Sequence, residues 1–224
     1  MKNDSVRANL HVHYSADLYD RYSERFLNWY DDFMIRRILF ECRKRPLDGV
    51  LMDVGTGTAR LLLKLALRPE LHTLRFIGTD YFPDMVRLAA RNARDNGFAG
   101  RVDILHADVH ALPFPDQCAS VVISRSTIHH WAKPVTALGE IYRILRSGGL
   151  ALIHDVRRDS TPPALIEFNR LRQVAGVEPS RLEEKYTTDE IRNFVAEAGL
   201  EERCMISAPR RGPASLGIEL RIVK

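Results

Sequence analysis

Asp53-Val54-Gly55-Thr56-Gly57-Thr58-Ala59-Arg60 is the stretch that decides the fold. Its first two residues are the end of the apolar run Gly49–Val54. Such a run is typical of a buried strand that ends at a tight turn. Gly55 and Gly57 let the backbone turn sharply and approach a ligand without a Cβ in the way. A helical pattern follows over about 58–68. The stretch therefore predicts a strand, a glycine turn and a helix, as in sheets that bind nucleotides.

The same alternation of short strands and helices continues along the chain. Strands are predicted over Leu74–Asp80, Arg101–His106, Ala119–Ser124 and Gly149–Val156, and helices over 83–96, 134–145, 163–175 and 188–198. Glu201–Ser207 and Ser215–Val223 are predicted to form a closing antiparallel pair. Strands that alternate with helices favour a parallel sheet wound on both faces. The predicted fold class is α/β, with a Rossmann-like, doubly wound, seven-stranded sheet that is mostly parallel and has an antiparallel closing strand.

The residues before the first strand form a different region. Over 14–45, an apolar residue recurs every three or four positions, at Leu18, Tyr22, Phe26, Trp29 and Phe33. This spacing is typical of amphipathic helix. We expect an N-terminal helical cap over 1–48 and a sheet domain over 49–224, within a single domain overall. Residues 156–187 have only a loose pattern, with Pro162-Pro163 and Glu178-Pro179, and we expect them to form a lid or a substrate wall.

The composition is that of an ordinary globular protein, with 45% hydrophobic and 28% charged residues among 224. The sequence contains no apolar run close to the roughly 20 residues of a membrane span, and its first residues lack the apolar core of a secretory signal. Cys42, Cys118 and Cys204 are scattered and form no Cys-x-x-Cys pair, so neither a disulfide framework nor a thiolate zinc site is expected. We expect a cytoplasmic protein with reduced thiols.

The formal net charge of +4 raises the question of a nucleic-acid partner. The longest basic clusters, Arg43-Lys44-Arg45, Arg157-Arg158 and Arg210-Arg211, are short and lie far apart. A nucleic-acid-binding protein concentrates its positive charge on one face or in one run. The sequence also lacks an Asn/Asp-Pro-Pro-aromatic signature after the fourth strand, where Ser124-Arg125-Ser126-Thr127 stands. We therefore expect neither a nucleic-acid substrate nor a membrane partner.

Acidic residues at the strand ends indicate which ligand the glycine turn binds. A dinucleotide fingerprint needs a third glycine where this chain has Arg60. Asp80, at the end of the second strand, can accept hydrogen bonds from both hydroxyls of a ribose. Asp108, after the third strand, can accept one from an adenine amino group. Because carboxylates repel phosphate, the pattern favours S-adenosylmethionine, which has cationic sulfonium and ammonium groups, over NAD.

Several stretches resemble class I S-adenosylmethionine-dependent methyltransferases, in particular the small-molecule branch of the ubiquinone and menaquinone methyltransferases. The matching residues are 53–59, 78–80 with Met85, 107–116, 126–131 and 140–149. Ala59 departs from the family, which often has a third glycine at this position, and this departure bears on how closely the turn packs.

The resemblance implies a role for each matching residue. Asp53, Gly55 and Gly57 would cradle the methionine part of the cofactor, and Asp80 would hold the ribose. Tyr81 and Met85 would lie against the adenine, and Asp108 with Val109 would bind its exocyclic nitrogen. In similar enzymes the N-terminal segment closes over the cofactor. The remaining expected cofactor contacts are Tyr14, Tyr19, Thr56 and Ser124.

Methyl transfer is an in-line displacement at a carbon that the sulfonium already activates, so the protein mainly aligns the reactants in a dry site. A general base is needed only for a nucleophile that is protonated at neutral pH. His129 and His130, just after the fourth strand, lie where the methyl group should point, and histidine has a suitable pKa. They are the predicted catalytic residues; the alternative is that they only shape the pocket.

The predicted reaction moves a methyl group from S-adenosylmethionine to a small metabolite with an O, N, S or C acceptor, and releases S-adenosylhomocysteine. The alternatives are a peptide or protein substrate, for which Arg157-Arg158 and the lid would form a basic groove, and a non-catalytic cofactor-binding subunit. The strands at 201–223 could supply a homodimer edge. No metal is predicted, because Ser124-Arg125 stands where a metal-dependent enzyme needs a carboxylate; His11-x-His13 and His154-Asp155 are the remaining ligand candidates.

Overall fold

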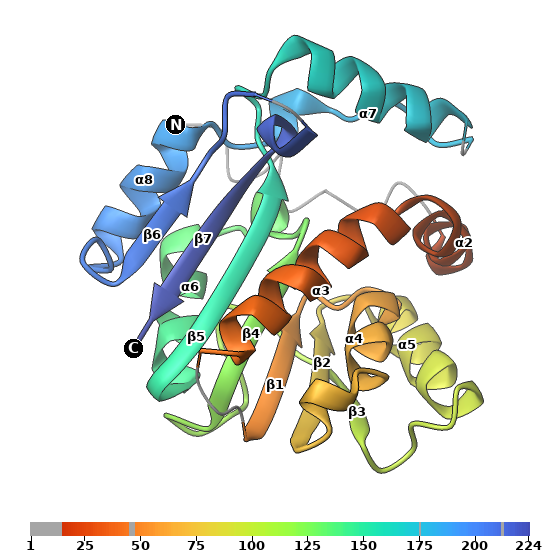
Figure 1. Ribbon diagram of the computed structural model, residues 1–224, viewed down its shortest axis with the longest axis vertical. Coiled ribbons are helices and arrows are strands. Elements are labelled where there is room, and N and C mark those ends of the chain that lie inside the picture. Colours follow the sequence, from red (N-terminus) through yellow and green to blue (C-terminus); the bar gives the residue numbers. More distant parts are fainter. Residues whose placement is uncertain (1–14, 45–47, 175, 212) are drawn as a thin grey trace.

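The computed structural model describes residues 15–44, 48–174, 176–211 and 213–224. Its strands are β1 (Gly49–Val54), β2 (Leu74–Asp80), β3 (Val102–His106), β4 (Ala119–Arg125), β5 (Leu145–Val156), β6 (Cys204–Ser207) and β7 (Gly217–Val223). They form one seven-stranded sheet in the order β3-β2-β1-β4-β5-β7-β6 (Figure 1). Strands β1 to β5 are parallel, and β7 runs antiparallel to both β5 and β6. The predicted fold class is confirmed.

Helices cover both faces of this sheet, which is why the central strands are continuous apolar runs. Helices α3 (Asn28–Cys42), α4 (Arg60–Ala66) and α5 (Pro83–Asp95) share a core with one face, and α6 (Pro134–Ile144) and α8 (Thr188–Glu197) with the other (Figure 1). Within β4, Val121 belongs to the first core and Val122 to the second. The short 3-10 helices are η1 (Pro69–Leu71), η2 (Ile128–His130), η3 (Leu182–Glu184) and η4 (Pro213–Leu216).

The predicted helical segment 14–45 contains two helices. Helix α2 (Ala16–Phe26) ends at Leu27, and α3 begins at the next residue. Helix α3 buries Met34 and Ile38 in the same core as Leu51 of β1, so it is one of the helices that cover the sheet. Helix α2 packs beside α4 and α5, and Asp20 accepts two hydrogen bonds from Arg60, at 2.8 and 2.6 Å. The division of the chain at residue 48 stays a prediction.

The order of the strands determines where a ligand can bind. The chain leaves β1 toward β2 on one side and returns to β4 on the other, so the order in which the strands are added reverses between β1 and β4. A crevice forms at such a reversal, beyond the carboxyl ends of the strands. The glycine turn after β1 lies at this end of the sheet. Helix α7 (Pro162–Val174) lies beyond the same end, where β5 finishes (Figure 1).

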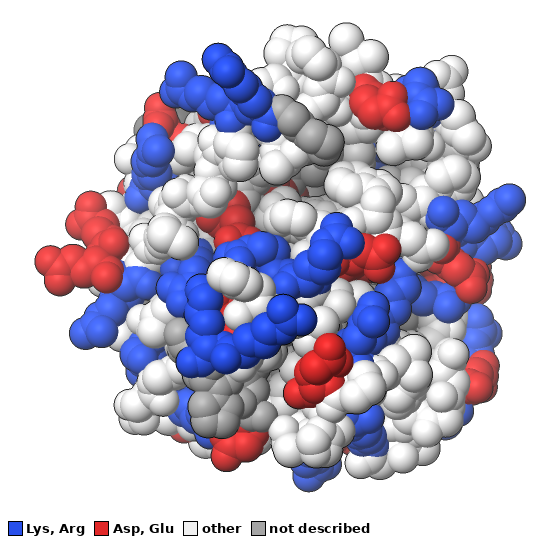
Figure 2. Space-filling view, viewed as in Figure 1, with Lys and Arg blue, Asp and Glu red and all other residues white. Residues whose placement is uncertain are grey.

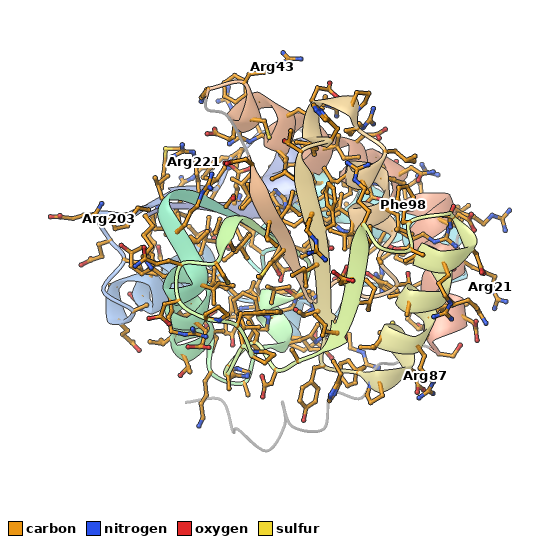
Figure 3. The ribbon with its side chains drawn as sticks, turned by 90° about the horizontal axis from the view of Figure 1, so that it is seen from below. Arg21, Arg43, Arg87, Phe98, Arg203 and Arg221 are labelled. Atoms are coloured by element: carbon orange, nitrogen blue, oxygen red, sulfur yellow. The ribbon has the colours of Figure 1, made fainter. Side chains whose placement is uncertain are left out.

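Positive charge is distributed over the outside of the molecule. Figure 2 shows Lys and Arg side chains gathered over the C-terminal half of α3 and the neighbouring β7. Many of them have acidic partners: Arg37 makes two hydrogen bonds to Glu219, and both Lys44 and Arg221 bind Glu41. Arg21, Arg43, Arg87 and Arg203 extend outward at the periphery (Figure 3). Among the described helices, none is long and apolar enough to span a membrane.

Candidate active site

A cavity of about 730 Å³ lies at the carboxyl ends of the parallel strands. Its wall is formed by the turn after β1, the ends of β2 and β5, the segments after β3 and β4, and by α2 and the chain from α7 to Lys185. Sites for small molecules range from about 300 to 1,000 Å³ and are lined mainly by apolar and aromatic side chains. The size and place of the cavity are therefore those of a small-molecule site.

Most of the predicted site residues meet in this cavity. Those that line it are Tyr19, Gly55, Gly57, Asp80, Tyr81, Met85, Asp108, Val109, His129 and His130. Asp53, Thr56 and Ser124 are buried outside its wall. Thr56 Oγ1 donates to Asp53 Oδ2 at 2.8 Å, and Ser124 Oγ donates to the Val54 carbonyl at 2.7 Å. These three support the turn from behind. Tyr14 lies outside the described residues.

Two glycines give the turn after β1 its shape. Gly55 and Gly57 both have left-handed φ angles, +74° and +56°. A Cβ on Gly55 would lie 2.4 Å from Thr127 Cγ2, and a Cβ on Gly57 would lie 3.0 Å from Tyr19 Cε1. Both the backbone angle and the space require glycine. Between Thr127 and Tyr19, the cavity is therefore lined by glycine backbone without side chains, so an extended ligand can approach it closely.

Ala59 takes the place where the related enzymes often have glycine. Its φ is +65°, at the start of α4, and its side chain is fully buried. A non-glycine residue in the left-handed region costs of order 1–3 kcal/mol. The alanine therefore keeps the glycine conformation of the turn, and its methyl group fills space in the core beside α4.

Asp80 presents a fixed carboxylate to the cavity. Its Oδ1 accepts the Phe82 N–H at 3.0 Å, and its Oδ2 accepts the Gly57 N–H at 2.8 Å. Burial raises the pKa of this carboxyl, and the two N–H donors act against that rise. Each carboxylate oxygen has a second lone pair, so Asp80 can also accept one hydroxyl per oxygen. This arrangement fits the two adjacent hydroxyls of a ribose.

Asp108 is oriented by a residue that the sequence analysis missed. His110 Nδ1 lies 2.5 Å from Asp108 Oδ1, and the Lys133 N–H donates to His110 Nε2 at 3.0 Å. Because Nε2 accepts, the proton of this neutral ring is on Nδ1 and is donated to Asp108. The same Oδ1 accepts the His110 backbone N–H at 2.9 Å. The other oxygen, Oδ2, makes no hydrogen bond to any described residue, so it suits an adenine amino group.

At the opposite side of the cavity, His129 forms a buried pair with Asp155, the last but one residue of β5. His129 Nδ1 lies 2.6 Å from Asp155 Oδ2, and the His129 backbone N–H donates to the same oxygen at 3.2 Å. The Val156 N–H donates to Oδ1 at 2.7 Å. Three N–H groups on one carboxylate favour its ionised form.

The protonation of this pair follows from its surroundings. Burial lowers the pKa of His129, which keeps the ring neutral at neutral pH. Burial acts to raise the pKa of Asp155, but attraction to His129, its hydrogen bonds and the charge of Lys185 lower it to about 2. Asp155 therefore accepts the Nδ1 proton, and Nε2 of His129 is left without one. A histidine in this tautomer can take a proton from a bound molecule.

A second buried network surrounds Tyr30, which lines the cavity. Arg125 ends β4 and pairs with Asp31 at 3.1 Å, and Lys64 binds the other oxygen of Asp31 at 2.5 Å. The Tyr30 hydroxyl bonds to Nδ1 of His154, whose pKa burial lowers to about 4. Both members of His154-Asp155 thus have protein partners. No three His, Cys, Asp or Glu side chains among the described residues are grouped so that they could hold a metal ion.

The side chains of Arg157 and Arg158, which were predicted to form a basic groove with the lid, both bond within the fold, and Arg157 lines a separate hollow of about 440 Å³ with Arg192 and Arg210. Arg157 is buried and donates to the Pro209 and Ser215 carbonyls at 2.6 and 3.2 Å. Arg158 pairs with Glu190 at 2.6 Å. Neither residue lines the cavity.

Other residues of the predicted lid do reach the cavity. Phe168 is the only described residue of α7 that is buried, and it lines the cavity with Arg172. The Arg172 guanidinium lies 5.6 Å from the centre of the Phe168 ring and 5.7 Å from that of Tyr22. Val177 packs on Tyr22 and Leu27. The lid segment therefore contacts α2 across the cavity, a contact between distant parts of the chain that no local pattern could reveal.

Part of this chain is similar to known proteins. A family model described as a methyltransferase domain matches residues 52–153. A demethylmenaquinone methyltransferase from Thermus thermophilus is 33% identical over 58% of this chain and 57% of its own length. A ubiquinone/menaquinone biosynthesis C-methyltransferase from Geobacter sulfurreducens is 30% identical over 70% of this chain and 60% of its own. The chain thus covers less than two thirds of either relative.

The fold as a whole is shared with solved structures. A SAM-dependent methyltransferase from Aquifex aeolicus superposes over the full length of both chains, with a TM-score of 0.63 and 18% sequence identity. At this level of identity the similarity concerns the fold alone. The family match, by contrast, spans the glycine turn, Asp80, Asp108 and His129.

Proposed function

The chain carries the methyltransferase domain of the class I, S-adenosylmethionine-dependent enzymes, and on that premise we propose that it transfers a methyl group from this cofactor to a small-molecule acceptor. The family and the cofactor predicted from the sequence are confirmed. The observation that carries the proposal is one cavity with Asp80 and Asp108 on one side and the His129–Asp155 pair on the other. The two sides suit a nucleoside and a reacting group, respectively.

The cofactor would bind along the ends of β1, β2 and β3. Asp80 would accept both ribose hydroxyls, and Asp108 with Val109 would bind the adenine edge. Tyr81 and Met85 would contact the adenine ring, since both line the cavity beside Asp80. The backbone of Gly55 and Gly57 would face the methionine part, near Tyr19. Asp53, Thr56 and Ser124 would act only through the shape of the turn.

The bound cofactor supplies an electrophilic methyl group on a sulfonium. The protein's part is to hold the acceptor in line with that methyl group and to exclude water. His129 would take the proton of the acceptor on Nε2, while Asp155 holds the Nδ1 proton and stabilises the cation that forms. His130, whose ring centre is 3.9 Å from that of His129, would shape the pocket next to it.

The names of the relatives and the chemistry of the cavity both bear on which kind of group accepts the methyl. The relatives from Thermus and Geobacter are named for menaquinone and ubiquinone methylation, and the second is named a C-methyltransferase. A carbon acceptor loses a proton during methylation, and so does a hydroxyl or a thiol, so the His129–Asp155 pair suits all three. A peptide acceptor has less support, because the arginines expected to bind it are engaged within the fold. The pair also favours catalysis over a purely cofactor-binding subunit.

A screen with labelled S-adenosylmethionine and a metabolite library tests the proposal. Once an acceptor is found, His129→Ala should lower kcat/KM by about 10²–10⁴-fold, the range of general-base catalysis. Burial lowers the pKa of His129, so the wild-type rate should fall with acid only below about pH 6.5, and this acid limb should vanish in the variant. His72→Ala, exposed and far from the cavity, is the matched control. Equal rates in His129→Ala and wild type at every pH would remove the base.

A further inference from the structure

One buried cation in the cavity has no partner in the described structure. Lys185 lines the cavity, and only 9% of the residue is exposed. Its ammonium makes no hydrogen bond or ion pair with any residue in the described ranges, whereas the other cations near it are engaged. Arg158, for example, binds Glu190, and Arg181 lies 3.5 Å from Glu184. A buried charge without a hydrogen-bonding partner is costly, so the position calls for an explanation.

The backbone around Lys185 is firmly held. Its N–H donates to the Leu182 carbonyl at 3.0 Å, and its own carbonyl accepts Nη1 of Arg158 at 2.9 Å. The Arg158 N–H donates to the next carbonyl, that of Tyr186, at 2.8 Å. Thr187 then caps the N-terminus of α8 through a reciprocal capping box with Glu190. The side chain is thus presented to the cavity from a fixed support, which is the arrangement that a binding group needs.

The charges around Lys185 do not neutralise it directly. Asp155 is near enough to attract it, but all three N–H bonds to that carboxylate come from His129 and Val156. Arg172, on the lid, repels it. Burial lowers the pKa of the ammonium despite the acidic neighbours, which means that the folded chain alone compensates the charge poorly. A negative group entering the cavity would complete the set.

We propose that Lys185 binds an anionic oxygen of the methyl acceptor and so determines which acceptors the enzyme takes. This inference rests on the proposed function, because it concerns the acceptor side of the same cavity. An ammonium is a point charge and suits a single oxygen. Lys185 and His129 line the same cavity, and both act on the charge of Asp155. An oxygen held by Lys185 therefore lies in the cavity that also holds the base.

The anionic oxygen has two possible sources. It is either an oxygen of a carboxylate that the acceptor carries permanently, or the oxygen of an aromatic hydroxyl group, which becomes an anion when His129 removes its proton. The aromatic walls formed by Tyr22, Phe168 and Trp131 suit a flat ring in both cases. Benzoate and 4-nitrophenol are probes for the two sources, and the absorbance of 4-nitrophenol also reports whether the bound form is the anion.

The experiment titrates each probe into the full chain saturated with S-adenosylhomocysteine. Wild type should bind at least one probe, and Lys185→Met should bind it at least about tenfold more weakly, as expected for a lost charge-assisted hydrogen bond. Lys185→Arg, which keeps the charge, should retain most of the affinity. Arg170→Met removes a cation from the exposed face of α7 and should bind like wild type. The probe that depends on Lys185 identifies the source of the oxygen.

Two further measurements separate the possible failures. Binding of S-adenosylhomocysteine should be the same in wild type and Lys185→Met, and its absence in wild type would contradict the proposed function without involving Lys185. The melting temperature of Lys185→Met should equal or exceed that of wild type, since replacing an unpaired buried charge by an apolar side chain is not destabilising. The inference is overturned if neither anion binds wild type, if Lys185→Met binds them equally well, or if its melting temperature falls by several degrees.

Discussion

Asp53 illustrates at the scale of one residue how a carboxylate can serve a site without touching it. It lies at the end of β1, buried, and accepts Thr56 Oγ1 at 2.8 Å. Burial raises its pKa to about 7, although Thr56 and the charge of Arg125 act in the other direction. The unfolded chain has an ordinary pKa near 3.9 for this group. Between these two values the folded chain binds a proton that the unfolded chain does not, so this residue lowers stability as the pH rises from about 4 to 7.

Replacing Asp53 by Asn should therefore stabilise the protein at high pH. The amide oxygen can still accept Thr56 Oγ1, and the cost of a buried charge is removed. We expect the melting temperature of Asp53→Asn to exceed that of wild type by a few degrees at pH 8 and by less at pH 5. In a chain of this size, a difference of about 2–4 °C corresponds to 1 kcal/mol. Scanning calorimetry at both values measures this, with the exposed Asp84→Asn as control. A pH-independent difference would contradict the assigned cause.

Single residues also mark the limit of what the sequence could predict about the site. Asp80, Asp108 and His129 could be placed because each lies at the end of a strand or shortly after it, at a position fixed by the fold. Asp155 was noticed only as half of His154-Asp155, and its pairing with His129 depends on the lateral register of β4 and β5. His110 and Lys185 carry no pattern of their own. His110 matters because it makes a hydrogen bond to Asp108, and Lys185 matters because its ammonium makes none to the described residues. Neither fact can be read from the sequence, because both depend on the three-dimensional structure.

At the scale of elements, the turn between β1 and α4 is fixed both by its backbone angles and by its close neighbours. Gly55 and Gly148 have nearly equal φ angles, +74° and +73°. They differ in surroundings: a Cβ on Gly55 would lie 2.4 Å from Thr127 Cγ2, whereas a Cβ on Gly148 would meet no atom within 4 Å. Comparing the two positions therefore separates backbone strain from the close approach of the segment after β4.

Gly148→Ala should cost about 1 kcal/mol, the strain of an alanine in the left-handed region. Gly55→Ala should cost clearly more and also weaken S-adenosylmethionine binding by at least about tenfold, because Thr127 must move and the wall of the cavity moves with it. Urea unfolding and calorimetric titration measure the two effects. If both variants lose the same stability and neither loses affinity, the turn does not shape the cofactor site.

The elements themselves were largely predictable because local signals agree with the fold. Strands β1 and β2 have the predicted bounds, since each is a short apolar run that ends at a turn residue. The break between α2 and α3 was missed: the apolar spacing runs through Leu27 without a glycine or proline to interrupt it. The loose pattern over 156–187 predicts a lid, but the residues of it that reach the cavity depend on contacts between distant parts of the chain. Arg172 lies over Tyr22 of α2, and Phe168 packs with Val156 and Leu216.

For the molecule as a whole, the excess of positive charge belongs to the outside. The gathered side chains over α3 and β7 are largely paired with Glu41 and Glu219, while the nucleoside side of the cavity presents Asp80 and Asp108. This separation agrees with a cationic cofactor in the cavity. The comparison with NAD, which carries phosphates, is therefore the sharpest test of the assignment.

Calorimetric titration of the full chain with S-adenosylmethionine and with NAD makes that test. S-adenosylmethionine should bind wild type, and Asp80→Ala should weaken it at least about tenfold, because two charge-assisted hydrogen bonds to the ribose are lost. Asp84→Ala, exposed at the start of α5, should bind like wild type. NAD should show no binding to any of the three. Binding of NAD in preference to S-adenosylmethionine, or equal affinity of wild type and Asp80→Ala for S-adenosylmethionine, would contradict the account.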